Sequence, residues 1–244
     1  MTSAAPPPDG AGKAEFDQYA NRYREIIDND RFTKLVGGSF DYFIDLRLGI
    51  MFSALGDGST RWRQPQLLDF GCGIGAAAAR LAQRVPEALV TGIDPSPESI
   101  RAAEAAGAPR TRFVVSDSVR LPFSDGTFDL VYSNGTFHHI PHADHPAILR
   151  ELHRVLKPGG DLFIFENNPF NPATVLAMHL SPLDKDAKMV LPPVLRRRVT
   201  DAGFRCGPPG YYIFFPQVLR RLRPLERGLR RLPLGGQYYV RGQR

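Results

Sequence analysis

The chain has 244 residues, 43% of them hydrophobic and 23% charged, values typical of a globular protein that can bury a core. It has no apolar run of about eighteen residues, and its first residues lack the charged and apolar regions of a leader, which argues against a membrane span and a secretory signal. Two distant cysteines exclude a disulfide framework, so we expect a reducing, cytoplasmic setting.

The net charge of +6 is unevenly distributed along the chain. Residues 1–195 carry 19 Lys and Arg against 23 Asp and Glu, whereas residues 196–244 carry 12 Arg against two acidic residues. The basic character therefore belongs to the last fifth of the chain, and any anionic partner would bind there.

The N-terminal part is predicted to be helical. Residues 1–12 are rich in Pro, Gly and Ala and indicate a disordered tail. Residues 14–30 place apolar side chains three or four apart, and residues 39–55 resume this pattern with Ser39 as a plausible N-cap. We expect residues 13–62 to form a helical cap in front of the main domain.

From residue 66 the pattern becomes an alternation of strands and helices. The strands are apolar without strict alternation, which is typical of a parallel sheet buried on both faces. The sequence predicts an α/β, doubly wound, mostly parallel, seven-stranded sheet within residues 63–244. The expected strands are 66–70, 88–94, 111–117, 128–134, 161–166, 211–215 and 237–240, and the expected helices are 76–86, 96–107, 145–156 and 192–204, with Ser96 and Asp144 as N-caps and a tight turn at 157–160.

Polar residues follow four successive strands of this sheet. Ligands of such sheets lie beyond the carboxyl ends of the strands, where the strand order reverses. Glycine is needed where φ is positive or where a backbone touches something closely, so the alternating glycines after the first strand indicate a bound molecule. The residues delivered there are Asp69, Gly71, Gly73, Gly75, Asp94, Pro95, Asp117, Ser118 and Asn134.

Three stretches carry a family resemblance: "LLDFGCGIG" at 67–75, "FDLVYSNGTFHHI" at 128–140 and "LKPGGDLFIFE" at 156–166. Over roughly residues 65–215 the chain resembles class I S-adenosylmethionine-dependent methyltransferases, the broad group that includes the ubiquinone and menaquinone C-methyltransferases. The resemblance implies a Rossmann-like fold with S-adenosyl-L-methionine as cofactor. It also implies that the glycine turn lies against the amino-acid part of the cofactor, Asp94 against the ribose hydroxyls, and Asp117 and Ser118 against the adenine.

A nicotinamide dinucleotide is the main rival cofactor. "GCGIGA" also reads as G-x-G-x-x-A, and Asp94 follows at about the right distance. Against this interpretation, Asp69 stands two residues before the first glycine, the glycines alternate at a third position, and Asp117 has no role in holding a pyrophosphate. A glycine turn that binds nothing is the remaining alternative.

Four histidines lie between residues 138 and 145. We predict no metal site, because prolines interrupt the helix that would align them and no cysteine is near. The resemblance implies that one of His138 and His139 faces the active site, where histidine suits a general base. We expect this base to be His139, with a packed structural role as the alternative for either histidine.

Residues 165–174, "FENNPFNPAT", follow the fifth strand, and their two Asn-Pro pairs predict a rigid turn. We expect Glu166 and Asn168 to form a substrate-facing wall there, opposite a lid that carries Tyr19 and Tyr23. The chain lacks the Asn-Pro-Pro-Tyr motif that related enzymes use on nucleobase amines or glutamine, which argues against those acceptors.

Residues 216–236 form a basic amphipathic element interrupted at Pro224. Its apolar residues recur at three- and four-residue intervals, and six arginines lie between residues 220 and 231. The element is either a cover packed on the sheet, a contact with an anionic membrane, or a site for an anionic, lipid-linked or phosphorylated acceptor. Nucleic acid is less favoured, because the rest of the chain is acidic and no RNA-binding module is present.

These observations favour an enzyme that transfers a methyl group from S-adenosyl-L-methionine to a small-molecule or lipid-like metabolite, and they leave peripheral membrane contact through residues 216–236 open as one of the three interpretations of that element. Two alternatives stay open: a non-catalytic protein of this fold that binds an anionic membrane or partner, and an RNA methyltransferase. Fold does not fix function, and the acceptor atom is left open.

Overall fold

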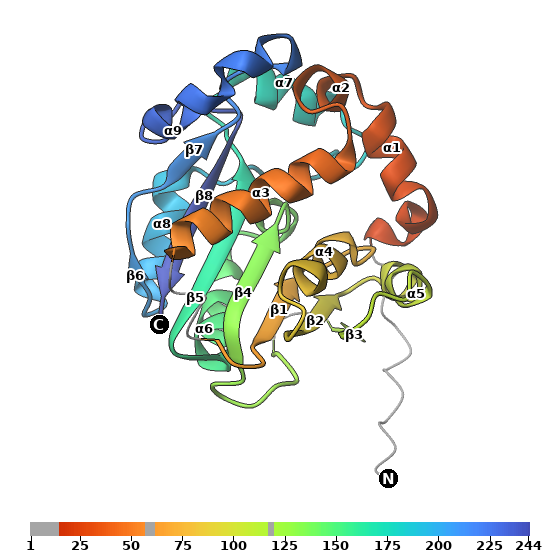
Figure 1. Ribbon diagram of the computed structural model, residues 1–244, viewed down its shortest axis with the longest axis vertical. Helices are drawn as coiled ribbons and strands as arrows, with labels where there is room; N and C mark the ends of the chain where they lie inside the picture. Colours follow the sequence, from red (N-terminus) through yellow and green to blue (C-terminus); the bar gives the residue numbers. More distant parts are fainter. Residues whose placement is uncertain (1–14, 57–61, 117–119) are drawn as a thin grey trace.

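The computed structural model describes residues 15–56, 62–116 and 120–244. An eight-stranded sheet lies between two layers of helices (Figure 1). The strand order is β3-β2-β1-β4-β5-β8-β6, with β7 also paired to β8. The strands are β1 Gln66–Phe70, β2 Leu89–Asp94, β3 Thr111–Val115, β4 Phe128–Asn134, β5 Leu156–Asn167, β6 Arg205–Cys206, β7 Gly210–Tyr212 and β8 Gln237–Gln243.

The first five strands are parallel, and β8 runs antiparallel to β5. The chain leaves β1 for β2 and β3 on one side and returns to β4 on the other, so the strand order reverses between β1 and β4. The predicted α/β, mostly parallel architecture is confirmed. The count of seven strands is wrong, because the short strands β6 and β7 both pair with β8.

Helices cover both faces of the sheet. Leu67 and Leu68 are adjacent on β1 and fully buried, and they belong to two different core clusters. One cluster packs against α3 and α4, the other against α6 and α8. The helices are α1 Tyr23–Asn29, α2 Arg31–Val36, α3 Phe40–Leu55, α4 Ala76–Arg84, α5 Pro97–Ala105, α6 His145–Val155, α7 Pro172–Leu180, α8 Pro192–Asp201 and α9 Glu226–Leu229, with 3-10 turns η1 Glu15–Gln18, η2 Ala20–Arg22, η4 Phe137–His139 and η5 Gln217–Leu225.

Two of the predicted N-caps are confirmed. The Ser39 side chain accepts a hydrogen bond from the Tyr42 N–H at 3.2 Å, and Ser96 accepts one from the Ser99 N–H at 3.0 Å. Asp144 also stands at the predicted N-cap position of α6, but its side chain makes no capping hydrogen bond.

The single helix predicted at residues 14–30 is also wrong. This segment consists of η1, η2 and the short helix α1, and the chain turns at Asp30. The carboxylate of Asp30 accepts a hydrogen bond from the Thr33 N–H at 2.6 Å and so begins a separate helix, α2.

Two later elements differ from prediction as well. The strand predicted at 211–215 ends at Tyr212, because the Glu226 carboxylate accepts the N–H groups of the next three residues at 3.0–3.1 Å. Residues 157–160, predicted as a tight turn, lie inside β5, where the register with β4 shifts. Among the described residues, no helix combines the length and apolarity needed to cross a bilayer.

Candidate active site

Two adjoining cavities lie at the carboxyl edge of the sheet, where the strand order reverses. The smaller, about 60 Å³, lies against the glycine turn after β1. The larger, about 600 Å³, lies between α1, α2 and α7 and the ends of β4 and β5. Both are lined by Tyr23, Phe40 and Asn134. A molecule bound in one cavity therefore lies next to a molecule bound in the other.

The glycine turn needs its glycines for two physical reasons. Gly71, Gly73 and Gly75 have φ angles of 74°, 50° and 75°, in the left-handed region that other residues avoid. A Cβ atom on Gly71 would lie 2.2 Å from the Thr136 hydroxyl oxygen, whereas one on Gly73 would meet nothing within 4 Å. The turn thus packs closely on one side and leaves space for a ligand at Gly73.

Asp69 is the buried acid beside this turn. Its side chain is 2% exposed, and its Oδ2 has no hydrogen-bond partner in the described structure. Burial, reinforced by the negative charge of Asp94, raises the pKa of Asp69 to about 7. Because a buried, unsatisfied carboxylate oxygen is costly, the small cavity favours a ligand that brings a donor or a cation to Asp69.

Asp94 ends β2 with its carboxylate held in a fixed orientation. It accepts hydrogen bonds from the backbone N–H groups of Gly73 and Ser96, both at 2.9 Å. Burial raises the pKa of Asp94, and these two hydrogen bonds oppose that shift. The exposed Pro95 follows in the turn to α5. The carboxylate is thereby oriented beside the glycine turn.

The N-terminal segment is tied to the same strand end. Asp17 in η1 accepts hydrogen bonds from the Ser96 hydroxyl at 2.6 Å and from the Glu98 N–H at 3.3 Å. The predicted adenine contacts Asp117 and Ser118 lie outside the described residues. What the structure shows is therefore a helical cap attached beside the end of β2.

A buried histidine and two carboxylates form a network on the wall of the larger cavity. His138 Nδ1 lies 2.5 Å from Glu166 Oε2, and its Nε2 lies 3.2 Å from Asp184 Oδ1. Glu166 also accepts the N–H groups of Thr136 and Phe137. Burial alone would lower the pKa of His138, but Glu166 and Asp184 outweigh it and raise that pKa to about 10. His138 is therefore cationic near neutral pH, with both ring nitrogens engaged.

His139 behaves in the opposite way. Its ring centroid is 4.2 Å from that of His138, and its Nε2 lies 3.6 Å from Asp184 Oδ1. Burial and the neighbouring His138 cation lower the pKa of His139 to about 4. At neutral pH this side chain is an uncharged imidazole that lines the larger cavity and retains a basic nitrogen.

The other two histidines of the cluster have structural partners. His142 Nε2 is bonded to the Lys188 carbonyl at 3.1 Å, and His145 Nε2 to the Phe137 and Ile140 carbonyls at 2.9 and 3.1 Å.

His138, His139 and Asp184 place potential metal-ligand atoms within 4.8 Å of one another. The spacing of the four histidines alone did not reveal this grouping, because Asp184 comes from 46 residues further along the chain than His138. Asp184 also accepts the hydrogen bond from His138 described above and lies 3.6 Å from His139. The absence of a metal from this site stays a prediction.

Arg47 on α3 places a buried positive charge in the wall of the larger cavity. It is 8% exposed and donates hydrogen bonds to the Tyr212 hydroxyl at 3.3 Å and to Gln237 Oε1 at 2.9 Å. Within the described residues no carboxylate pairs with it. This part of the cavity is suited to an anionic or strongly accepting group.

Comparison with known proteins agrees with this geometry. Residues 67–160 match the family model of a methyltransferase domain. Trans-aconitate 2-methyltransferase of Deinococcus radiodurans is 42% identical over 99 residues, 41% of this chain and 36% of that protein. Demethylmenaquinone methyltransferase of Thermus thermophilus is 41% identical over 108 residues, 43% of this chain and 48% of that protein. Residues 67–160 therefore resemble the domain of class I S-adenosylmethionine-dependent methyltransferases.

The likeness in fold extends beyond the matched methyltransferase domain. A chain from the complex between the Haloferax volcanii Trm112 methyltransferase activator and a methyltransferase has a TM-score of 0.67 and 21% identity, covering 96% of this chain and 99% of that one. The sequence matches to the two curated methyltransferases, by contrast, span only about a third to a half of their length.

The two cavities bring most of the predicted site residues together. Tyr23, Asn134 and Glu166 line the larger cavity with both histidines, and Asp69 and the glycine turn line the smaller one. Tyr19 lines neither cavity. The prediction for Asn168 is corrected. Its buried amide donates to the Pro233 and Gly235 carbonyls at 3.1 and 2.7 Å and accepts from the Phe170 N–H, so it fastens the chain behind the site.

The sequence did not reveal that Arg47, Asp184 and Asn167 line the larger cavity. The sequence did contain a signal for Arg47. This cation lies on the apolar stripe of residues 39–55, and a cation that is buried with such a stripe needs a polar partner. Asp184 lies between α7 and α8, in a segment without a recognisable pattern.

Proposed function

We propose that this protein transfers a methyl group from S-adenosyl-L-methionine to a small-molecule acceptor with an apolar body. One observation carries the proposal: a cavity against the glycine turn joins a ten-fold larger cavity whose inner wall carries an uncharged histidine. Methyl transfer needs the nucleophile, methyl group and sulfur in line, and two adjoining cavities allow that alignment.

The residues around the smaller cavity fit the cofactor. The glycine turn leaves space at Gly73, and Asp69 offers an unsatisfied oxygen for the ammonium group of the cofactor. Asp94, already oriented by two backbone N–H groups, would accept the ribose hydroxyls, with Asp117 and Ser118 proposed for the adenine. When bound, the cofactor supplies an electrophilic methyl group on a sulfonium.

The larger cavity suits an amphiphilic acceptor. Charged and polar side chains in its lining include Arg47, Glu166 and Asp184, beside the two histidines. Its apolar lining residues include Ile26, Ile27, Phe32, Leu35, Val36, Phe43, Ala173, Ala177, Met178, Phe214 and Phe215. The relatives named for trans-aconitate and demethylmenaquinone support a small-molecule acceptor, and this lining favours an apolar or lipid-like one.

His139 is the proposed general base. A proton from the acceptor would move to the uncharged imidazole, and Asp184, 3.6 Å away, would stabilise the imidazolium that forms. Arg47 would stabilise negative charge on the deprotonated acceptor. His138 has no free ring nitrogen, so its proposed role is to position Glu166 and Asp184.

We further propose that residues 216–236 provide peripheral contact with an anionic membrane.

We also propose that residues 13–62 act as a lid. Tyr23 lines both cavities, and Asp17 fastens the segment beside Asp94, which supports closure over a bound cofactor. Closure would exclude water from the transfer.

Two measurements test the proposal. Calorimetric titration should show binding of S-adenosyl-L-homocysteine and none of NAD. Incubation with methyl-labelled cofactor and fractionated lipid, quinone, sugar and RNA extracts should label the lipid or quinone fraction. Labelled RNA would show that RNA is the acceptor in place of a small-molecule metabolite. Binding of S-adenosyl-L-homocysteine without any labelled fraction would favour the non-catalytic alternative.

A further inference from the structure

Three elements that line the larger cavity or directly follow its lining residues carry exposed apolar side chains. Leu35 of α2 lines the cavity and is also exposed. Leu176 and Leu180 of α7 are exposed, the latter by 67%. Val218 and Leu225 of η5 are exposed by 79% and 60%. These elements together form what we call the rim.

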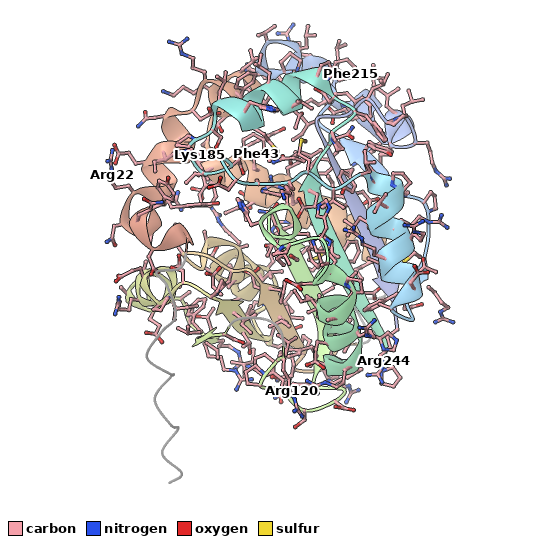
Figure 2. All side chains as sticks on the ribbon, turned by 180° about the vertical axis from the view of Figure 1, so that it is seen from behind. Arg22, Phe43, Arg120, Lys185, Phe215 and Arg244 are labelled. Atoms are coloured by element: carbon pink, nitrogen blue, oxygen red, sulfur yellow. The ribbon has the colours of Figure 1, made fainter. Side chains whose placement is uncertain are left out.

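The elements of the rim lie together at one end of the molecule. In Figure 1 the orange α2, the teal α7 and the blue segment with η5 and α9 lie together at that end. Asn171, which caps α7, donates from its side chain to the Leu234 carbonyl, and Arg223 of η5 donates to the Val36 carbonyl at the end of α2. Figure 2 places Phe215 at this end and Arg120 and Arg244 at the opposite end.

Helix α7 is unusual for a helix at a water-exposed surface. Its sequence, PATVLAMHL, has no Asp, Glu, Lys or Arg, and Met178 is its single buried residue. An apolar helix of this kind normally lies in a core, because exposing leucine to water forfeits the free energy of burial. The exposed face of α7 therefore calls for an apolar partner.

Positive charge accompanies the apolar rim. Arg220, Arg221, Arg227 and Arg231 are exposed on η5, on α9 and just beyond it. None of the four forms an ion pair with a residue that the structure describes. Glu226, the acid in their midst, is engaged by the backbone of residues 213–215. Exposed leucines next to unpaired arginines match the apolar interior and anionic headgroups of a membrane surface.

We infer that the rim docks on an anionic lipid bilayer and presents the mouth of the larger cavity to it, so that a lipid acceptor enters from the membrane with its reactive head toward His139. This inference rests on the proposed function for its acceptor, while the docking stands on the rim itself. A nucleic acid would use the arginines but has no need of exposed leucines on α7 and α2. The bilayer is favoured because it uses both.

Vesicle co-sedimentation tests the docking. The protein should bind vesicles of phosphatidylglycerol and phosphatidylcholine at low salt, and bind pure phosphatidylcholine at least about tenfold more weakly. Leu180→Ser and Arg221→Glu should each weaken binding about tenfold. The matched controls Val115→Ser, on exposed edge strand β3, and Arg120→Glu, at the opposite end, should bind like the parent protein.

The outcomes separate the docking from the proposed function. Absence of vesicle binding at low salt, with S-adenosyl-L-homocysteine binding intact, would overturn the docking and the membrane contact proposed for residues 216–236, and would leave the proposed methyl transfer in place. A loss of binding in Arg221→Glu but not in Leu180→Ser would also overturn it, in favour of a polyanion such as RNA. A dimer in light scattering that Leu180→Ser dissociates would show that a second copy covers the rim. Vesicle binding without binding of S-adenosyl-L-homocysteine would leave the docking in place and refute the proposed function.

Discussion

The charge on His138 makes the stability of this protein depend on pH in an unusual range. A histidine whose pKa is raised on folding stabilises the folded state fully below its unfolded pKa, and the stabilisation disappears as pH rises through its folded pKa. With a reference value of 6.5 and a folded value of about 10, the loss should occur between about pH 6.5 and 10.

The magnitude follows from the same shift. One pKa unit corresponds to about 1.36 kcal/mol, so the free energy of unfolding should fall by on the order of 4 kcal/mol across this range. Replacement of His138 by Asn should lower the free energy of unfolding near neutral pH by about 3–5 kcal/mol, because Glu166 and Asp184 would remain buried without their cation. The variant should then show little further loss up to pH 10.

Urea unfolding followed by circular dichroism at several pH values measures both effects. His142→Asn is the matched control, because His142 lies four positions away and bonds to a single backbone carbonyl. This variant should keep the parent's pH dependence. A parent protein whose stability is unchanged between pH 6.5 and 10 would refute the charged state of His138 and, with it, the contrast between the two histidines.

Four further predictions concern the site itself. His139→Ala should reduce kcat by about 100-fold or more without changing the Kd of S-adenosyl-L-homocysteine, measured by calorimetry; unchanged turnover would reject the base. Asp69→Asn should weaken binding of S-adenosyl-L-methionine by about tenfold or more. In the parent protein that affinity should decline as pH falls through about 7, where Asp69 becomes protonated, and a flat profile would contradict this. Asp17→Ala should free the cap and speed limited proteolysis ahead of α3, at a cost of about 1–2 kcal/mol. Dialysis against EDTA should leave turnover unchanged, whereas a loss restored by a divalent ion would show that the histidine network binds a metal.

Local patterns in the sequence were sufficient for the parallel strands and for the position of the glycine turn and two acids at the carboxyl edge of the sheet. The glycines after β1 have the positive φ angles that their spacing implied, and Asp69 and Asp94 lie at neighbouring strand ends. Parallel pairing explains this success, because it brings the ends of successive strands to one edge regardless of what lies between them.

The acceptor side depends on contacts between distant segments and was predicted less well. Asp184 reaches His138 from a segment without periodicity, and α7 was missed because its two Asn-Pro pairs indicated a turn. In the structure Asn171 and Pro172 begin that helix as N-cap and first residue. Asn168 was assigned to the substrate wall because it is a polar residue next to the predicted site. The sequence does not show that its side chain bonds to backbone carbonyls 65 and 67 residues further along the chain.

The opposite charge states of His138 and His139 depend on one another. The cation on His138 is maintained by two buried carboxylates, and that cation helps to keep its neighbour neutral. Removal of either carboxylate should therefore raise the pKa of His139 if His138 loses its positive charge as a result. If His138 stays charged, the loss of a nearby negative charge should lower the pKa of His139. Asp184→Asn separates these effects, because Asp184 contacts both rings at 3.2 and 3.6 Å while Glu166 contacts His138. A pKa of His139 that falls further in Asp184→Asn would show that Glu166 alone keeps His138 charged.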